Sequence, residues 1–398
     1  MTPELARADR AAAVREAARS WRRAGWIDEA ALAAVASRFP DDRVRVGPVF
    51  RALLFLFTAI AVCGGFGFLA VTVASGHDGV LAGLALAAGA SLVAATELLT
   101  GTFRRRQGGI EAATSLMAIA LLLGGGAWWL FSPGGLHLAD GWPVFWTATA
   151  ALTGAAAWRW GYPLYAGIGT AAGLAAVAHL PAGRALWIAL PLAAAPALVR
   201  LAESPRLPPA HRASATAALL VALAGLYVAV HVGSWDARLV ESLGGGHAEG
   251  LPPAADGGLA RWAAVAAMIL MPALLLAAGV WRRRLPLLAA GAAAAIASLA
   301  TLPAYVHLGP LWLVLTVGGA AWIAVVLGAW RYLEAGPAGE RHGFTAAPLT
   351  ADRARQSLLE AAAAAALTMP AEPRALGAEP NFAGGGGRSG GGGASGEY

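Results

Sequence analysis

The chain has 398 residues, of which 58% are hydrophobic and 13% are charged, and its mean hydropathy is +0.60. Soluble globular domains carry about 25% charged residues, so this composition excludes an ordinary soluble domain and indicates a protein embedded in a lipid bilayer. The formal net charge is +6, but the arginines cluster between apolar segments and no base-reading or stacking module is present, so we expect no nucleic-acid partner.

Residues 1–48 precede the first long apolar segment and are predicted to form a cytoplasmic helical hairpin. Pro3 is typical of the start of a helix, Gly25 of its end, and Asp28 of the cap of a second helix over 29–37. The segment lacks a short apolar run followed by a small-residue cleavage site, so we expect no cleaved signal peptide.

Residues 21–30 read WRRAGWIDEA, in which tryptophan, glycine, an aliphatic residue and an acid precede a helix and then many apolar segments. In this order the segment resembles the bacterial membrane-protein family catalogued as domain of unknown function 2157. The resemblance covers residues 15–40 closely and the rest of the chain only in general shape. It implies that this segment is cytoplasmic and brings no established activity or catalytic residue.

Ten apolar segments follow the hairpin, and a helix needs about 20 such residues to cross a hydrocarbon core of roughly 30 Å. We therefore predict an all-α fold, a polytopic bundle of about ten spans over residues 49–331 that contacts the lipid bilayer. The predicted spans are 50–74, 79–99, 110–131, 142–158, 162–180, 185–201, 213–233, 259–281, 285–305 and 310–330.

Arginines in the turns predict the orientation, because cationic loops stay on the cytoplasmic side of a membrane. If the N-terminus is cytoplasmic, the outer turns and their edges contain only three arginines, Arg184, Arg238 and Arg261. The arginines of the inner turns are then Arg104, Arg105, Arg106, Arg159, Arg200, Arg206, Arg212, Arg282, Arg283 and Arg284. We therefore expect a multi-pass protein of the bacterial inner membrane with both termini in the cytoplasm.

Two carboxylates are candidates for polar function. Glu97 lies near the inner end of the second span and Glu111 at the inner start of the third, on either side of the arginine turn 104–106. Charged groups at a bilayer centre cost about 3 kcal/mol and usually carry function, but these two lie near its surface. One interpretation is an ion cluster that fixes this helical hairpin, and the other is a proton or cation relay.

Pro191 and Pro196 in the sixth span remove backbone hydrogen bonds and are expected to kink it. Interrupted helices occur at transporter binding sites, so one hypothesis is a solute cavity flanked by both prolines. Ordinary kinks relieved by neighbouring helices are the alternative. Close approach of helices is predicted at two glycine pairs, Gly79 with Gly83 and Gly169 with Gly173.

Most of the histidines fall on the predicted outer side. Imidazole binds transition metals and titrates near neutral pH, so an outer metal site or pH-responsive face is one hypothesis, and interfacial histidines are the other. No pair of histidines at helical spacing supports a metal site, so we assign no metal ligand. The candidate residues are His77, His137, His179, His231 and His307.

The chain contains none of the short motifs of hydrolases, phosphate loops, dinucleotide-binding folds or zinc proteases. We therefore expect no enzymatic activity and assign no catalytic or cofactor-binding residue. Cys63 is the only cysteine, which excludes an internal disulfide.

Residues 332–398 are predicted to form a cytoplasmic tail with an alanine-rich helix and, from Glu379 onward, a flexible glycine-rich end. The end is similar to the glycine-rich tails of bacterial membrane-anchored TPM-domain proteins. This similarity implies that a partner binds the terminal residues around Tyr398, and a plain tether is the alternative.

The two ends of the chain are polar, and the apolar segments between them contain no chain of ionisable residues that could relay a proton or ion. This pattern favours a non-enzymatic envelope protein. It would scaffold or sense through its cytoplasmic ends, with a protein partner at the N-terminal hairpin or the C-terminal tail. The alternatives are a transporter or channel for a small solute at the sixth span, and an outer-face metal or pH-responsive protein.

Overall fold

A computed structural model gives the architecture of the chain. It describes residues 3–23, 25–40, 43, 46–74, 77–105, 108–132, 136, 141–180, 183–231, 259–305, 311–337, 340–341 and 344–346. These residues confirm the predicted all-α fold, to which the strands β1 (Glu340–Arg341) and β2 (Phe344–Thr345) add one short antiparallel pair. The predicted tail helix and the glycine-rich end lie outside the described residues.

The N-terminal segment forms the two predicted helices, α1 (Pro3–Arg23) and α2 (Glu29–Arg38). Gly25 takes the left-handed conformation, with φ of 74°, that ends α1. The amide of Trp26 donates to the carbonyl oxygen of Trp21 at 2.9 Å, which satisfies an acceptor at the end of the helix. The side chain of Asp28 then accepts from the amide of Ala31 at 2.7 Å and caps α2.

Apolar helices occupy all ten predicted positions. Seven of them, α3, α4, α5, α8, α9, α11 and α13, are long and apolar enough to cross a membrane, and α7 and α12 contain shorter apolar segments. The number of ten spans therefore stays a prediction. The helices are α3 (Pro48–Val73), α4 (Asp78–Gly101), α5 (Ile110–Phe131), α6 (Gly141–Trp160), α7 (Pro163–Ala178), α8 (Gly183–Glu203), α9 (Pro209–Val230), α11 (Leu259–Arg282), α12 (Leu285–Tyr305) and α13 (Leu311–Glu334).

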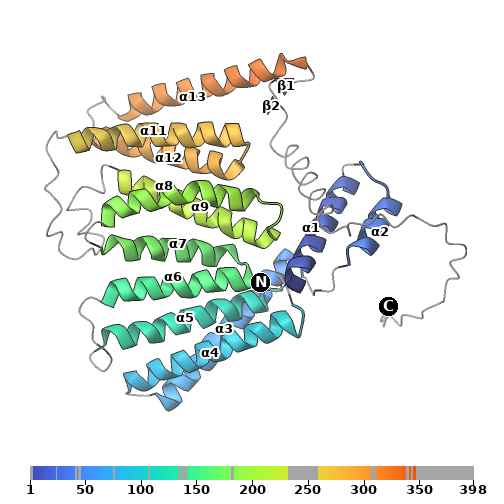
Figure 1. The fold of residues 1–398 in the computed structure, drawn as a ribbon, viewed down its shortest axis with the longest axis vertical. Helices are drawn as coiled ribbons and strands as arrows, with labels where there is room; N and C mark the ends of the chain where they lie inside the picture. The colour runs from blue at the N-terminus through green and yellow to red at the C-terminus, as the bar shows by residue number, and fades with distance from the viewer. Residues whose placement is uncertain are drawn as a thin grey trace, which may run out of the picture.

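The apolar helices lie side by side, from α3 and α4 at one edge to α13 at the other (Figure 1). Consecutive helices pack as antiparallel hairpins, α4 with α5, α6 with α7, α8 with α9 and α11 with α12, and α9 also packs against α7 and α12. The hairpin α1–α2 and the strand pair after α13 lie at the same end of these helices. We call this the α1 end of the bundle and the opposite one the far end.

Glycines allow α4 and α5 to approach each other closely. A methyl group at Gly89 would lie 2.8 Å from Cγ of Leu122, and one at Gly125 would lie 2.9 Å from the carbonyl oxygen of Ala82. In each glycine pair predicted from spacing, one member does not meet a neighbouring helix. Gly83 and Gly173 have nothing within 4 Å of an added methyl group, so the prediction is wrong for these two. Spacing finds small residues but not the face that meets a neighbour.

The outer surface of the bundle is apolar. On α3, for example, Phe57, Phe68 and Val71 are 64%, 69% and 73% exposed. An exposed apolar surface of this extent is typical of contact with lipid rather than water.

Candidate functional site at the α1 end of the bundle

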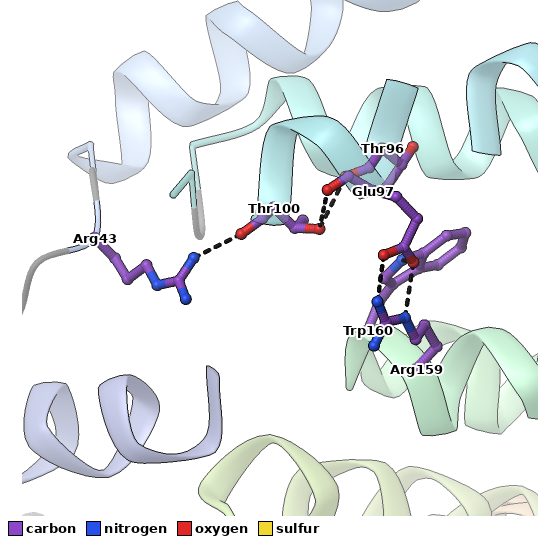
Figure 2. Close-up of polar contacts among 6 residues, drawn as sticks. All are labelled: Arg43, Thr96, Glu97, Thr100, Arg159 and Trp160. Atoms are coloured by element: carbon purple, nitrogen blue, oxygen red, sulfur yellow. Dashed lines mark hydrogen bonds and ion pairs between the residues drawn. The ribbon is translucent and has the colours of Figure 1, made fainter. Parts of the chain in front are cut away.

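Polar side chains gather near the α1 end of α4, α5 and α6. Glu97 of α4 accepts two hydrogen bonds from the guanidinium of Arg159 at the end of α6, from Nε to Oε1 at 2.9 Å and from Nη2 to Oε2 at 2.5 Å (Figure 2). The indole of Trp160 donates a third, to Oε1 at 2.9 Å. Such a bidentate pair between charged groups is among the stronger and more directional polar contacts in proteins, and here it ties α6 to α4.

Two threonines of α4 make further polar contacts, to α5 and to the linker that follows the N-terminal hairpin. Thr96, which is fully buried, donates from Oγ1 to Oγ1 of Thr114 on α5 at 3.0 Å. The carbonyl oxygen of Thr100, one turn along α4, accepts from Nη1 of Arg43 at 2.6 Å (Figure 2). Because Arg43 lies in the linker between α2 and α3, this bond fastens the linker to the end of α4.

A buried hydroxyl pair joins α5 to α7. Ser115 is 0% exposed and Tyr165 is 2% exposed, and their oxygens are 2.6 Å apart. A hydrogen bond sealed from water in this way contributes about 1 kcal/mol to stability.

Replacing Tyr165 with phenylalanine removes this bond and leaves the ring packing in place. We expect the free energy of unfolding to fall by about 1 kcal/mol, because the Ser115 hydroxyl loses a buried partner. Tyr332→Phe at an exposed position makes the same chemical change and should leave stability within about 0.5 kcal/mol of the parent. Unfolding in mixed micelles with increasing dodecyl sulfate measures both, and equal stability of the two variants would contradict this role of the pair.

The two predicted carboxylates have different partners. Glu111 is fully buried, and its Oε1 accepts from the amide of Gly108 at 2.6 Å, so it holds the α4–α5 turn through the backbone. Glu97 binds α6 instead, through Arg159, which the sequence placed only among the arginines of the inner turns. The polar cluster therefore ties three helices together rather than closing a single hairpin.

A pocket of about 990 Å³ lies between α1 and this end of the bundle. Its walls come from α1, from Arg43 of the linker, from the first turns of α3, α5 and α9, and from the α6–α7 turn. Small residues such as Ala12, Gly109, Gly161 and Ala210 line much of it. Its charged lining residues are Asp9, Arg15, Glu16, Arg19, Arg43 and Arg51.

The two prolines of the sixth span differ in their surroundings. Pro191 is fully buried, whereas Pro196 is exposed on another face, and α8 continues as one helix through both. Neither proline lines the pocket described above. These positions give no support to a solute site on α8.

The candidate outer histidines that the structure describes lie apart from one another, at the far ends of three helices. His77 precedes α4 and His179 follows α7, and both are exposed. His231 follows α9, and its Nε2 lies 2.8 Å from the Thr301 hydroxyl. Within the described part of the chain, no three His, Cys, Asp or Glu side chains could hold a metal ion. His137 and His307 lie outside the described residues.

The sequence did not predict a pocket at this end of the bundle. Arg51 in the first turn of an apolar helix was available as a signal, since a cation at the start of a helix opposes its dipole and needs another reason to be there. Which of the many arginines share one space could not be deduced, because they come from separate segments of the chain.

The apolar bundle, its lipid-facing surface and the polar cluster at one end define an α-helical integral membrane protein. No family model, curated protein or solved structure matches the chain. The resemblance of residues 15–40 to the family of domain of unknown function 2157 stays a prediction, as does the similarity of the tail.

Proposed function

We propose that the protein is a non-enzymatic sensor or scaffold of the bacterial inner membrane that acts through its cytoplasmic ends, chiefly the hairpin α1–α2. The observation that carries the proposal is the contrast between the two helices. Leu5, Val14 and Ala18 of α1 are buried, whereas α2 has no buried residue. Helix α1 is thus held against the rest of the protein, and the surface of α2 is accessible to a partner.

Contacts between α1 and the bundle support a role in which the hairpin follows changes in the membrane domain. Arg10 donates from Nη2 to the carbonyl oxygen of Arg206, at 3.1 Å, in the turn before α9. Arg43, beyond α2, is bonded to the end of α4. The hairpin is therefore attached on both sides, and a shift of either attachment would move the surface that α2 and the half-exposed Trp26 offer to a partner.

The cytoplasmic location rests on the turns that carry arginine. Arg206 contacts α1, and Arg282 and Arg284 contact Glu203 at the end of α8, so these turns share the α1 end. By the rule that cationic turns stay inside, this end is assigned to the cytoplasm.

Thiol labelling of intact cells tests this orientation. With Cys63→Ala as background, we expect His179→Cys, at the far end, to react with a membrane-impermeant reagent. Ser37→Cys, exposed on α2, should react only after the cells are permeabilised. The reverse pattern would place the hairpin outside and overturn the proposal.

Photo-crosslinking tests the partner surface. A photoreactive amino acid in place of Ala33, exposed on α2, is expected to give discrete protein adducts, and the same group in place of His179 at the far end is not. Arg10→Ala removes the bond to Arg206 and should change the yield of the Ala33 adducts. Absence of adducts at Ala33 would contradict the scaffold, and yields unaffected by Arg10→Ala would contradict the coupling that a sensor needs.

A transporter or an outer metal-binding protein remains a different class of hypothesis. No observation on the described residues favours either over the hairpin, because one proline of α8 is buried and the other exposed, neither lines the pocket, and the described outer histidines stand apart.

A further inference from the structure

We propose that the pocket between α1 and the bundle binds a phosphate-bearing ligand, and that occupancy of this pocket is what the hairpin senses. The binding site stands on the geometry of the pocket, and the sensory role given to it rests on the function proposed above.

Side-chain charge in the pocket favours an anion. Four arginines and two acids line it, which leaves an excess of positive charge. Glu16 is paired with Arg19 at 2.8 Å and with Arg23 at 3.4 Å, so the excess positive charge comes from Arg15, Arg43 and Arg51 against Asp9. Guanidinium groups recognise phosphate through paired, charge-assisted hydrogen bonds, and arginines from α1, the linker and α3 line this one space.

The N-termini of helices also contribute to the positive charge of the pocket. The pocket is lined by Gly109, Tyr162 and Pro209, which lie at the N-termini of α5, α7 and α9. A helix N-terminus carries roughly half a positive charge and offers amide donors. None of these three helices has a side-chain capping hydrogen bond. The starts of α7 and α9 therefore add partial positive charge beside the arginines, whereas the carboxylate of Glu111 offsets it at the start of α5.

Arg51 brings a cation to the pocket from the first turn of α3. Its Nε is buried, and among the described residues it has no hydrogen-bond partner. A ligand in the pocket would therefore meet this guanidinium through its terminal nitrogens, which carry four of its five N–H donors. The adjacent lining is small, since Gly109 and Ala112 let a ligand reach the backbone at the start of α5.

The volume limits the size of the ligand. Pockets of roughly 300–1,000 Å³ hold organic ligands, and about 990 Å³ is at the upper end of that range. This space suits a nucleotide, another phosphorylated metabolite or the headgroup of an anionic phospholipid. These ligands share phosphate chemistry, and the pocket lies at the end of the apolar helices, where both soluble and lipid sources are within reach.

The experiment uses the full chain in nanodiscs and pyrophosphate as the soluble probe. In phosphatidylcholine nanodiscs, titration calorimetry and the melting temperature report pyrophosphate binding. A second arm adds phosphatidylglycerol to the nanodiscs without pyrophosphate and follows the melting temperature. A response in the first arm assigns a soluble ligand, and a response in the second arm alone assigns a lipid headgroup.

Arg51→Gln is expected to weaken whichever response is found by about tenfold, the effect of losing one charge-assisted hydrogen bond to phosphate. Arg7→Gln, on an exposed position of α1 outside the pocket, is the matched control and should change it less than about twofold. If Arg51→Gln does not fold, Arg15→Gln takes its place. No response to either probe, or equal losses in Arg7→Gln and Arg51→Gln, would overturn the site.

Crosslinking at Ala33, repeated with and without the phosphate probe, tests the binding site and its sensory role separately. If the probe binds and the Ala33 adducts change with it, both parts of the inference hold. If the probe binds and the adducts do not change, the site stands and its link to the hairpin is wrong. If adducts form but no phosphate probe binds, the scaffold stands and the pocket is not an anion site.

Discussion

Gly109→Ala is expected to lower the free energy of unfolding by about 3 kcal/mol or more. Gly109 has a φ of 96°, in the region that residues with a side chain rarely adopt. An added methyl carbon would also lie 2.2 Å from the carbonyl oxygen of Arg51, so the starts of α3 and α5 would have to separate. Backbone strain of about 1–3 kcal/mol and overpacking of similar size add to this total.

Gly124→Ala in the same helix is the control for Gly109→Ala. Nothing lies within 4 Å of a methyl group there, so the change should be neutral or stabilise the helix by up to about 1 kcal/mol. Unfolding in mixed micelles, followed by circular dichroism, compares the two variants with the parent. A Gly109→Ala protein as stable as Gly124→Ala would mean that α3 and α5 do not meet as described.

Glu97→Gln is expected to destabilise the protein by about 2 kcal/mol. The charged acceptor of two bonds from Arg159 and one from Trp160 is lost, and hydrogen bonds to charged groups contribute about 1.5–3 kcal/mol. The Glu97 and Arg159 side chains are 33% and 47% exposed, which keeps the expected loss toward the lower end of that range.

A double-mutant cycle isolates this pair. Glu97→Gln together with Arg159→Gln should cost less than the two single changes added, with a coupling energy of about 1–2 kcal/mol. Glu203→Gln is the comparison at similar exposure, since Glu203 is 28% exposed and its contacts with Arg282 and Arg284 are longer, 3.4 and 3.3 Å. We expect a loss below about 1 kcal/mol there. Strictly additive losses at Glu97 and Arg159 would show that the contact contributes nothing as a pair.

Local chemistry made the element boundaries predictable. The predicted third span, 110–131, and ninth span, 285–305, coincide with α5 and α12. The end of α1 and the cap of α2 also follow from Gly25 and Asp28, because a left-handed glycine and a capping carboxylate act within a few residues of themselves. Hydrophobic length and local turn residues are readable without any knowledge of neighbours.

Partner choice inside the bundle was not predictable in this way. Glu97 and Arg159 are 62 positions apart, and the sequence offered the nearer arginines of turn 104–106 as equally good partners. Likewise Gly83 had the favoured spacing, but Gly89 makes the close contact. Helices that are apolar all round carry little periodicity to mark the face that meets a neighbour, since lipid and protein are equally apolar.

The sequence by itself determined that this is an α-helical membrane protein with a helical hairpin before its first span, because burial of the backbone in lipid requires long apolar helices and polar segments must lie outside. Only the tertiary structure decided that α1 returns to the bundle and encloses a cationic pocket with the starts of α3, α5, α7 and α9. The pocket arises from helix ends that are distant in the chain, and their meeting is set by packing across the whole bundle rather than by any local signal.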